Sequence, residues 1–498
     1  MPSSFEKFIV ENAEAEVPRL LLSSVQWPVP DDPDLSAFDG KQLAISTIES
    51  RKKLRDKVPE WYSITSLVYP ASVSAEQCSS SVTAAYKASL LARILEGASS
   101  KSVADLTGGL GVDSWAFSHV SDKVLYNEMD HGLASAARHN FRELGSENIH
   151  VVNLEIKPGG LGDVLGSFKP DVIFLDPARR DSAGGKVFLL EDCSPNVLEL
   201  VPELFSYSRN ILLKLSPMVD ISMVVERLNR AYESHLESRS GDGWNGNWVR
   251  EIHVVASGGE CKELLVWMDR EWSGEYVVTC REDGGSLSCS SEEIRSTKAI
   301  LPEAVDFKYI FEPGKSLAKA GVFNVLCSRF GLVKLARSTN LFSFPFAPFA
   351  SRKDGALAAK GAFAPYASRK DGALAAKGAW APYASRPIRV NVRPGALPPE
   401  PSPVTKSAPP VILSEAKDLF PLGKIYEVTE IVRMNKAGMR DIGRRFPRSE
   451  VSAKNIPLSS SELRSRLGVK SGDDAHIFGV RIETPFQADN FLLVCHRI

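Results

Sequence analysis

The stretch that most constrains the fold runs from Ser102 to Asp130 and reads SVADLTGGLGVDSWAFSHVSDKVLYNEMD. Apolar residues lead into the glycine-rich turn 107–111, and a second apolar run at 124–126 ends at Glu128. This pattern predicts a strand, a tight turn, a short helix and a second strand. Glycines let the backbone pass close to a ligand, and the helix points its free N–H groups at the same place. The stretch therefore predicts a site for a small molecule.

Composition narrows the class of protein. The 498 residues, enough for two or three domains, include 60 basic and 61 acidic side chains, so any affinity for nucleic acid must come from a local patch. The seven cysteines form no C-x-x-C pair, which argues against structural zinc and disulfides and favours a cytoplasmic location. No stretch approaches the roughly 20 apolar residues that a membrane span requires. We expect a cytoplasmic protein with no metal and no membrane partner, and with an oligomeric state that the sequence leaves open.

The glycine turn fits a dinucleotide motif poorly, because Ser114 stands where G-x-G-x-x-G requires its third glycine. Instead, Asp105 precedes Gly109-x-Gly111, and Glu128 ends the next strand. Two carboxylates would repel a phosphate and suit a ligand with a cationic amine. This arrangement resembles the motif of class I S-adenosylmethionine-dependent methyltransferases. In that family the turn passes beside the amino-acid part of the cofactor, and the second acid holds the ribose hydroxyls.

A wider resemblance covers most of the chain and rests on four motifs in order. They are EQCSS with the following TAAYK at 76–87, DLTGGLGVD at 105–113, DPARR at 176–180 and KLSPMVD at 214–220. Together they resemble a bacterial family described as class I methyltransferases with a THUMP-like C-terminal domain. The resemblance implies S-adenosyl-L-methionine as the cofactor. It implies cofactor contacts at Asp105, Thr107, Gly108, Gly109, Gly111, Glu128 and Asp176.

The segment after the glycine turn alternates strand and helix patterns, which predicts a parallel sheet with its ligand site at the carboxyl ends of the strands. Expected elements are a helix at Gly132–Leu144 and strands at Ile149–Val152, Asp171–Leu175, Asn210–Lys214, Val249–Ala256 and Glu263–Met268. The link between the last two is too short for a parallel crossover, so they should form an antiparallel hairpin. Glu128, Asp176 and Lys214 should meet on one rim.

We expect an α/β protein of four parts. These are an N-terminal helical region at 1–95, a Rossmann-like class I methyltransferase domain at 96–270, a small ferredoxin-like α+β unit at 271–325 and a THUMP-like domain at 326–498. Within the last part, FAPFASRKDGALAAKGA at 346–362 recurs almost unchanged at 363–379. Two copies are too few for a solenoid, so the stretch 344–419 should be a disordered insertion in a tolerant loop. Its flanks, 340–343 and 420–424, should then be neighbours in space.

The acceptor side of the site is expected at Asp176, Pro177, Arg179 and Lys214. Asp176-Pro177 stands where methyltransferases acting on amino groups of bases carry an acid or Asn before two prolines and an aromatic. Here Ala178-Arg179-Arg180 replaces the aromatic, which argues against adenine-N6 chemistry. An arginine plane could stack on a base or bind a phosphate. Salt bridges within the domain are the other interpretation of Arg179 and Arg180.

The tail is basic. From Arg433 to Lys470, ten Lys or Arg minus three acids give +7, as expected of a THUMP-like domain that binds RNA, either rRNA or tRNA. We expect RNA contacts at Arg444, Arg445 and Arg448. A basic surface with no partner is the alternative interpretation. The run Arg51–Lys57 is a second candidate for a polyanion contact.

These features favour an S-adenosylmethionine-dependent methyltransferase that modifies a base in RNA. One alternative keeps the cofactor and takes a protein or small molecule as the acceptor. Another is an RNA-binding module with a vestigial cofactor site, against which the intact set Asp105, Gly109, Gly111 and Glu128 argues.

Overall fold

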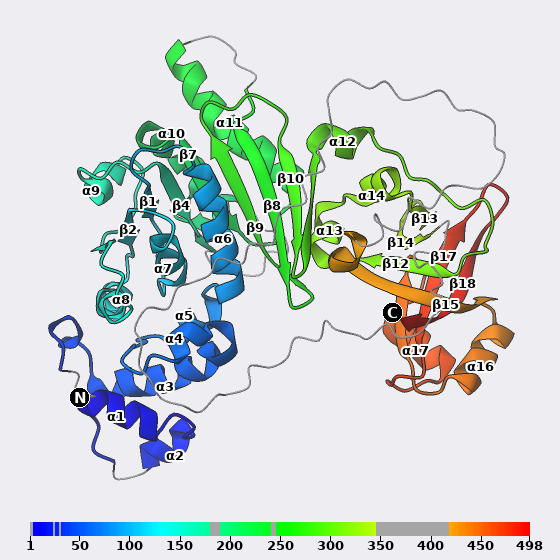
Figure 1. The fold of residues 1–498 in the computed structure, drawn as a ribbon, viewed down its shortest axis with the longest axis horizontal. Coiled ribbons are helices and arrows are strands. Elements are labelled where there is room, and N and C mark those ends of the chain that lie inside the picture. The colour runs from blue at the N-terminus through cyan, green and yellow to red at the C-terminus, as the bar shows by residue number, and fades with distance from the viewer. Residues whose placement is uncertain (1–2, 23–24, 29–30, 180–189, 241–245, 345–417) are drawn as a thin grey trace, which may run out of the picture. The chain divides into compact units, whose positions relative to one another are not determined.

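The computed structural model describes residues 3–22, 25–28, 31–179, 190–240, 246–344 and 418–498 (Figure 1). Nearly all of the predicted insertion, and Arg180, lie outside these residues. The chain divides into two compact units, each built on one large sheet. The first comprises residues 1–283, 287–295 and 315–320, and the second comprises residues 284–286, 296–314 and 321–498.

The first unit begins with helices, as predicted. They are α1 (Ser4–Glu11), α2 (Val17–Leu22), α3 (Gly40–Lys57), α4 (Pro59–Tyr62), α5 (Ser72–Gln77) and α6 (Ser81–Ile94). The Ser80 hydroxyl caps α6 by accepting the Thr83 amide at 3.2 Å. Val82, near the start of this helix, is 60% exposed. The buried side instead carries Ala84 and Lys87, because a buried ion pair fixes how this helix turns toward the sheet.

A nine-stranded sheet follows, with helices on both faces (Figure 1). Its strand order is β11-β10-β8-β9-β7-β4-β1-β2-β3. The strands are β1 (Ser102–Asp105), β2 (Lys123–Asn127), β3 (Ile149–Val152), β4 (Val172–Leu175), β7 (Asn210–Leu215), β8 (Val249–Ser257), β9 (Glu260–Asp269), β10 (Val277–Glu282) and β11 (Gly285–Ser290). The accompanying helices are α7 (Val112–Ser118), α8 (His131–Glu143), α9 (Leu161–Leu165), α10 (Val197–Tyr207) and α11 (Ile221–Ser240).

The first five strands of this sheet are parallel. Strands β1, β2, β4 and β7 are largely buried, which accounts for their apolar sequences, whereas the edge strand β3 is only half-buried. Strand β9 runs antiparallel to β7 and to β8, so the predicted hairpin is present. The sheet is larger than the sequence suggested. Residues 271–325 were assigned to a separate ferredoxin-like unit, whereas β10 pairs in parallel with β8 and extends the first sheet.

The second unit holds a seven-stranded sheet in the order β13-β14-β12-β15-β18-β17-β16. Its strands are β12 (Tyr309–Pro313), β13 (Val333–Ala336), β14 (Thr339–Ser343), β15 (Gly423–Arg433), β16 (Glu450–Lys454), β17 (His476–Glu483) and β18 (Ala488–Arg497). Its helices include α14 (Phe323–Phe330), α16 (Lys436–Arg445) and α17 (Ser460–Leu467). Tyr309 starts β12, and the following helix α13 (Lys315–Ala320) belongs to the first unit.

The strands that flank the insertion are near each other but not adjacent. Strand β12 pairs antiparallel with β14 on one side and with β15 on the other. Phe311, for example, faces Phe342 and Ile425. The flanks are therefore neighbours in space through a shared strand, since β12, which precedes both of them in sequence, lies between them.

No helix in the described parts of the chain is long and apolar enough to cross a membrane. All seven cysteines are free thiols.

Candidate active site

The glycine turn joins β1 to α7 at the carboxyl edge of the parallel strands. A Cβ on Gly108 would lie 2.1 Å from the Tyr126 ring, and Gly111 has a φ of +93° with the Phe141 ring 2.7 Å from its would-be Cβ. These two glycines therefore let the turn pack against β2 and α8. Gly109 differs, because its φ is +54° and no atom lies within 4 Å of the position of a Cβ. The turn is thus open at Gly109.

Strand β2 holds this turn from the side. The Tyr126 hydroxyl donates to the Gly109 carbonyl at 2.6 Å, and the Gly109 amide donates to the Glu128 carboxylate at 2.8 Å. The other Glu128 oxygen accepts the Asp130 amide at 2.9 Å. A carboxylate has about four acceptor positions, so Glu128 keeps capacity for further donors. Its position beside the open Gly109 makes it available to a ligand.

Asp105 lies beneath the turn and is only 1% exposed. Its carboxylate accepts the Ser114 hydroxyl at 2.5 Å and the Thr107 amide at 3.2 Å. Burial raises the pKa of Asp105 to about 7, although the hydrogen bond from Ser114 opposes the shift. Asp105 therefore organises the turn from inside and brings a titratable charge close to it.

The acceptor candidates meet on the same rim. The Asp176 amide, just after β4, donates to the Thr107 hydroxyl at 2.6 Å, which ties the DPARR motif to the glycine turn. The Lys214 ammonium, from β7, donates to the Asp176 carboxylate. Burial disfavours the charged form of Lys214, but Asp176 and two further carboxylates outweigh it and raise the pKa. Lys214 is therefore a fixed cation that orients Asp176.

A buried ionic cluster, defined here as Ser79, Lys87, Asp113 and Glu263, lies next to this pair. The Lys87 ammonium is fully buried, 3.0 and 2.8 Å from the two Glu263 oxygens and 3.2 Å from Asp113. The Ser79 hydroxyl donates to Asp113 at 2.8 Å and accepts from Lys87 at 3.0 Å. The cluster joins α6, α7 and β9, so the motif at 76–87 holds the rim together.

The sequence motifs contain Ser79 and Lys87, and a predicted strand begins at Glu263, but the sequence predicts no role for these three residues. The available signal was a charged residue inside an apolar pattern. Lys87 stands among alanines and leucines on the buried side of α6, and Glu263 begins the apolar run of β9. Such residues are almost never buried unless paired, but the sequence alone does not identify the partner.

Part of the predicted acceptor site lies outside the described residues. The Arg179 side chain lies outside the described residues, as does all of Arg180. Pro177 follows Asp176, and Ala178–Arg179 forms the short strand β5, paired with Cys193–Ser194 in β6. The acceptor role of the two arginines therefore stays a prediction.

The basic run at 51–57 is committed to internal contacts. Arg51 is 5% exposed and donates to the carbonyls of Ile64 at 2.9 Å and Tyr62 at 2.7 Å. The other four cations of the run bond to nearby carbonyls or carboxylates. The cations of this run therefore stabilise the helical region, which argues against the run as a polyanion contact.

The three predicted RNA-binding arginines lie in the second unit, on α16 and just after it. Arg444 pairs with Asp441 at 3.0 Å, and Arg445 pairs with Asp441 at 3.1 Å and with Glu430. Arg448 is exposed, and its guanidinium forms no ion pair within the part of the tail that the structure describes. The three arginines therefore differ in charge environment, because described carboxylates of the same unit pair with Arg444 and Arg445 but not with Arg448.

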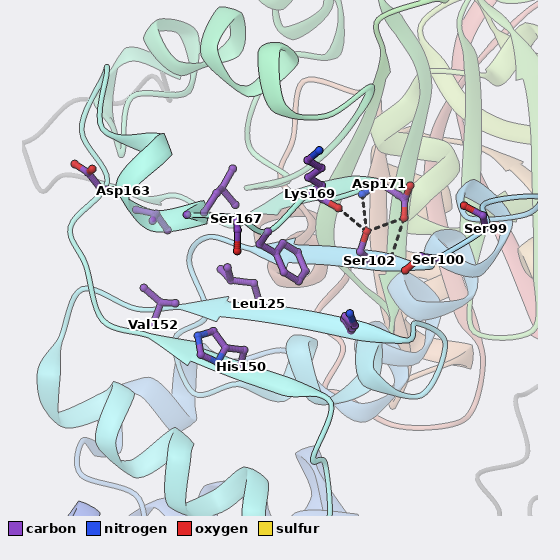
Figure 2. A pocket seen from close by; sticks show the side chains of 15 residues that line it. Ser99, Ser100, Ser102, Leu125, His150, Val152, Asp163, Ser167, Lys169 and Asp171 are labelled. Atoms are coloured by element: carbon purple, nitrogen blue, oxygen red, sulfur yellow. Dashed lines mark hydrogen bonds between the residues drawn. The ribbon is translucent and has the colours of Figure 1, made fainter.

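A hollow of about 710 Å³ lies away from this rim (Figure 2). It runs along β2 and β3 and past the start of β1, and α9 forms part of its wall. Its most buried polar groups satisfy one another, since the Ser102 hydroxyl lies 2.7 Å from the Asp171 carboxylate and 2.8 Å from the Lys169 carbonyl. None of Asp105, Glu128 and Asp176 lines it.

The sheet order and the rim of the first unit are those of the class I methyltransferase fold, and comparison with known proteins identifies further parts of the chain. Family models match a ferredoxin-like domain at residues 309–344 and a THUMP domain-like region at residues 423–497. The crystal structure of a presumed methyltransferase from Porphyromonas gingivalis W83 is similar over 99% of this chain and 97% of that one, at 25% identity and a TM-score of 0.68. The resemblance drawn from sequence is confirmed in these terms.

More remote structures overlap only in part. An rRNA methylase from Streptococcus thermophilus is 15% identical over 37% of this chain and 93% of that one, with a TM-score of 0.24. TrmK from M. capricolum, solved with S-adenosyl-homocysteine, is 10% identical over 38% of this chain and 69% of that one, with a TM-score of 0.27. No curated protein matches the sequence.

Proposed function

We propose that this protein is an S-adenosylmethionine-dependent methyltransferase that methylates a base in RNA. The observation that carries the proposal is the glycine turn. No described atom lies within 4 Å of the position of a Cβ on Gly109, the Gly109 amide is bonded to Glu128, and Asp176 is tied to the same turn through Thr107. An open backbone cradle between a ribose-binding acid and an acceptor-side acid is the arrangement that methyl transfer to a bound nucleophile requires.

The residues present fit the cofactor. Gly109 leaves room for a ligand, Glu128 has free acceptor capacity for two hydroxyls, and Asp105, when it is ionised above pH 7, supplies negative charge for an ammonium group. When bound, S-adenosylmethionine supplies a methyl group on a sulfonium. The chain's contribution is to hold and orient, because such a transfer is a displacement that depends chiefly on alignment.

On the acceptor side, Asp176 accepts a hydrogen bond from the group to be methylated. The neighbouring Lys214 ammonium fixes one Asp176 oxygen and leaves the other for the acceptor. The ionic cluster behind Lys214 prevents that side chain from swinging away, since Asp113 and Glu263 attract it as well. Asp176 is therefore the residue that touches the acceptor, and Lys214 is a positioning residue.

RNA is the acceptor that the tail supports best. Lys436, Arg440, Arg448 and Lys470 are exposed and form no ion pair among the described residues. Arg448 and Lys470 are also paired through a backbone bridge, which brings two cationic residues side by side. Unneutralised cations on one α+β domain attract a phosphate backbone.

The proposal that this protein binds S-adenosylmethionine is tested by calorimetric titration of the cofactor into the full chain. Glu128→Ala should weaken binding by at least roughly tenfold, because a hydrogen-bonding charge is lost. Glu143→Ala, at the exposed end of α8, is the matched control and should bind like wild type. Wild-type protein that fails to bind, or a Glu128 variant that binds normally, would overturn the assignment.

A further inference from the structure

The turn between β17 and β18 presents an aromatic side chain to solvent. Phe486 is 89% exposed, more than any other large apolar residue in the described chain. Single exposed apolar residues are common, so exposure alone carries no conclusion. What sets Phe486 apart is how its turn is built and which residues adjoin it.

The turn is held rigid by one residue. The Thr484 hydroxyl accepts the amides of Phe486 at 3.3 Å and Gln487 at 3.1 Å, while the Thr484 amide donates to the Gln487 carbonyl at 2.8 Å. The flanking strands stay paired up to Glu483 opposite Ala488. The backbone of Phe486 is thus already ordered, so a partner that stacks on its ring need not pay for fixing the loop.

Cationic residues from two other strands adjoin this turn. Arg433, at the end of β15, donates to the Gln487 side chain at 3.1 Å and pairs with Asp489 at 3.1 Å. The Arg337 amide, in the β13–β14 turn, donates to Glu483 at 3.1 Å. Both arginines are exposed. The turn that carries Phe486 therefore contacts the Arg433 side chain, which Asp489 partly neutralises, and adjoins the backbone of Arg337, whose guanidinium forms no ion pair among the described residues.

An aromatic ring with adjacent cations is the combination that binds an unpaired nucleotide, because the base stacks on the ring and the phosphate meets the charge. A protein contact would favour a larger contiguous apolar patch than this single ring. We propose that Phe486, with Arg337 and Arg433 on the segments that adjoin its turn, is a stacking platform for an unpaired base of RNA. The proposal rests on the RNA-directed function proposed above. It adds a contact outside the exposed cations of the tail named there, Lys436, Arg440, Arg448 and Lys470.

The test measures binding of a fluorescein-labelled single-stranded oligoadenylate of about 12 nucleotides, within the site size of single-strand binding folds. The full chain is compared with Phe486→Ala, Phe486→Trp and the control Ile300→Ala, an exposed apolar residue of the same unit. Phe486→Ala should lower affinity about tenfold, because one stacked base is lost. The dependence of affinity on salt should stay unchanged, because no phosphate contact is removed. Phe486→Trp should bind at least as tightly as wild type.

The outcomes separate the two proposals. Wild-type protein that does not bind the oligonucleotide contradicts the RNA-directed function itself. Wild-type binding that Phe486→Ala leaves unchanged overturns only the stacking platform. A wild-type dimer in sedimentation that Phe486→Ala converts to monomer, with no change in oligonucleotide binding, assigns the ring to a protein contact and also overturns it.

Discussion

Charged side chains cluster both on the rim of the first unit and on the tail of the second unit, but those on the rim are buried and those on the tail are exposed. On the rim, Asp105 is 1% exposed and Lys87 is fully buried, and each is hydrogen bonded. On the tail, Arg444 has a side chain that is 79% exposed. Buried charges must be paired and are fixed in place, whereas exposed charges act through a screened field. Rim substitutions should therefore alter stability as well as binding, and tail substitutions should alter binding alone.

The largest difference in stability is expected between variants of two lysines, one on the rim and one on the tail. Lys87→Ala leaves Glu263 and Asp113 buried without their cation, which should cost about 3–5 kcal/mol of unfolding free energy. Lys436→Ala, on the exposed surface, should leave the urea midpoint almost unchanged. The double variant Lys87→Met with Glu263→Gln should recover part of the loss, because it removes both charges. Equal urea midpoints for the two single variants would contradict the predicted difference in stability effects between the rim and the tail.

The second prediction concerns pH. Burial raises the pKa of Asp105 to about 7, above its ordinary value of 3.8, so the folded protein keeps a proton that the unfolded chain releases. The contribution of Asp105 to stability is thus complete below pH 3.8 and is lost as pH rises toward 7. Asp105→Asn, which has no charge to bury, should stabilise the protein at pH 8 by up to about 4 kcal/mol relative to wild type.

This advantage should vanish near pH 4, where both forms are neutral, and thermal melts across the range measure it. The same variant should bind S-adenosylmethionine more weakly, because the ammonium group loses a nearby charge. A stability difference that does not vary with pH would show that Asp105 does not titrate in the folded protein.

The smallest effects are expected on the tail. Arg440, Arg448 and Lys470 have no ion pairs among the described residues, whereas Arg444 and Arg445 do. Replacing the first three by Ala should lower the salt slope of RNA binding by roughly 2, at about 0.7 for each single-strand phosphate contact. Replacing Arg444 and Arg445 should change it less. Filter binding at several salt concentrations measures both, and the reverse order would show that ion pairing does not select the phosphate contacts.

Much of the rim could be predicted because its signals are local. The strand Ile149–Val152 appears at its predicted bounds, and the turn with Glu128 after β2 follows from glycines and acids at fixed spacing. Parallel pairing then carries Asp176 and Lys214 to the same edge without further information.

The remainder depends on contacts between distant residues. The burial of Lys87 requires Glu263, which is 176 positions away in sequence. The side of α6 that faces the sheet, the pairing of β10 with β8 and the insertion of β12 between β14 and β15 are all settled by such partners. Likewise, the +7 charge of the tail was visible in the sequence, but not which of its arginines are neutralised.

The most direct test of the central claim is methyl transfer itself. The full chain, S-adenosylmethionine with a tritiated methyl group and total bacterial RNA are incubated together, and radioactivity is measured in nucleosides after digestion. We expect label in one modified nucleoside with wild-type protein and Glu143→Ala, and almost none with Glu128→Ala or Asp176→Ala. Label that appears in protein or in a small molecule, or incorporation that survives both rim substitutions, would contradict the account.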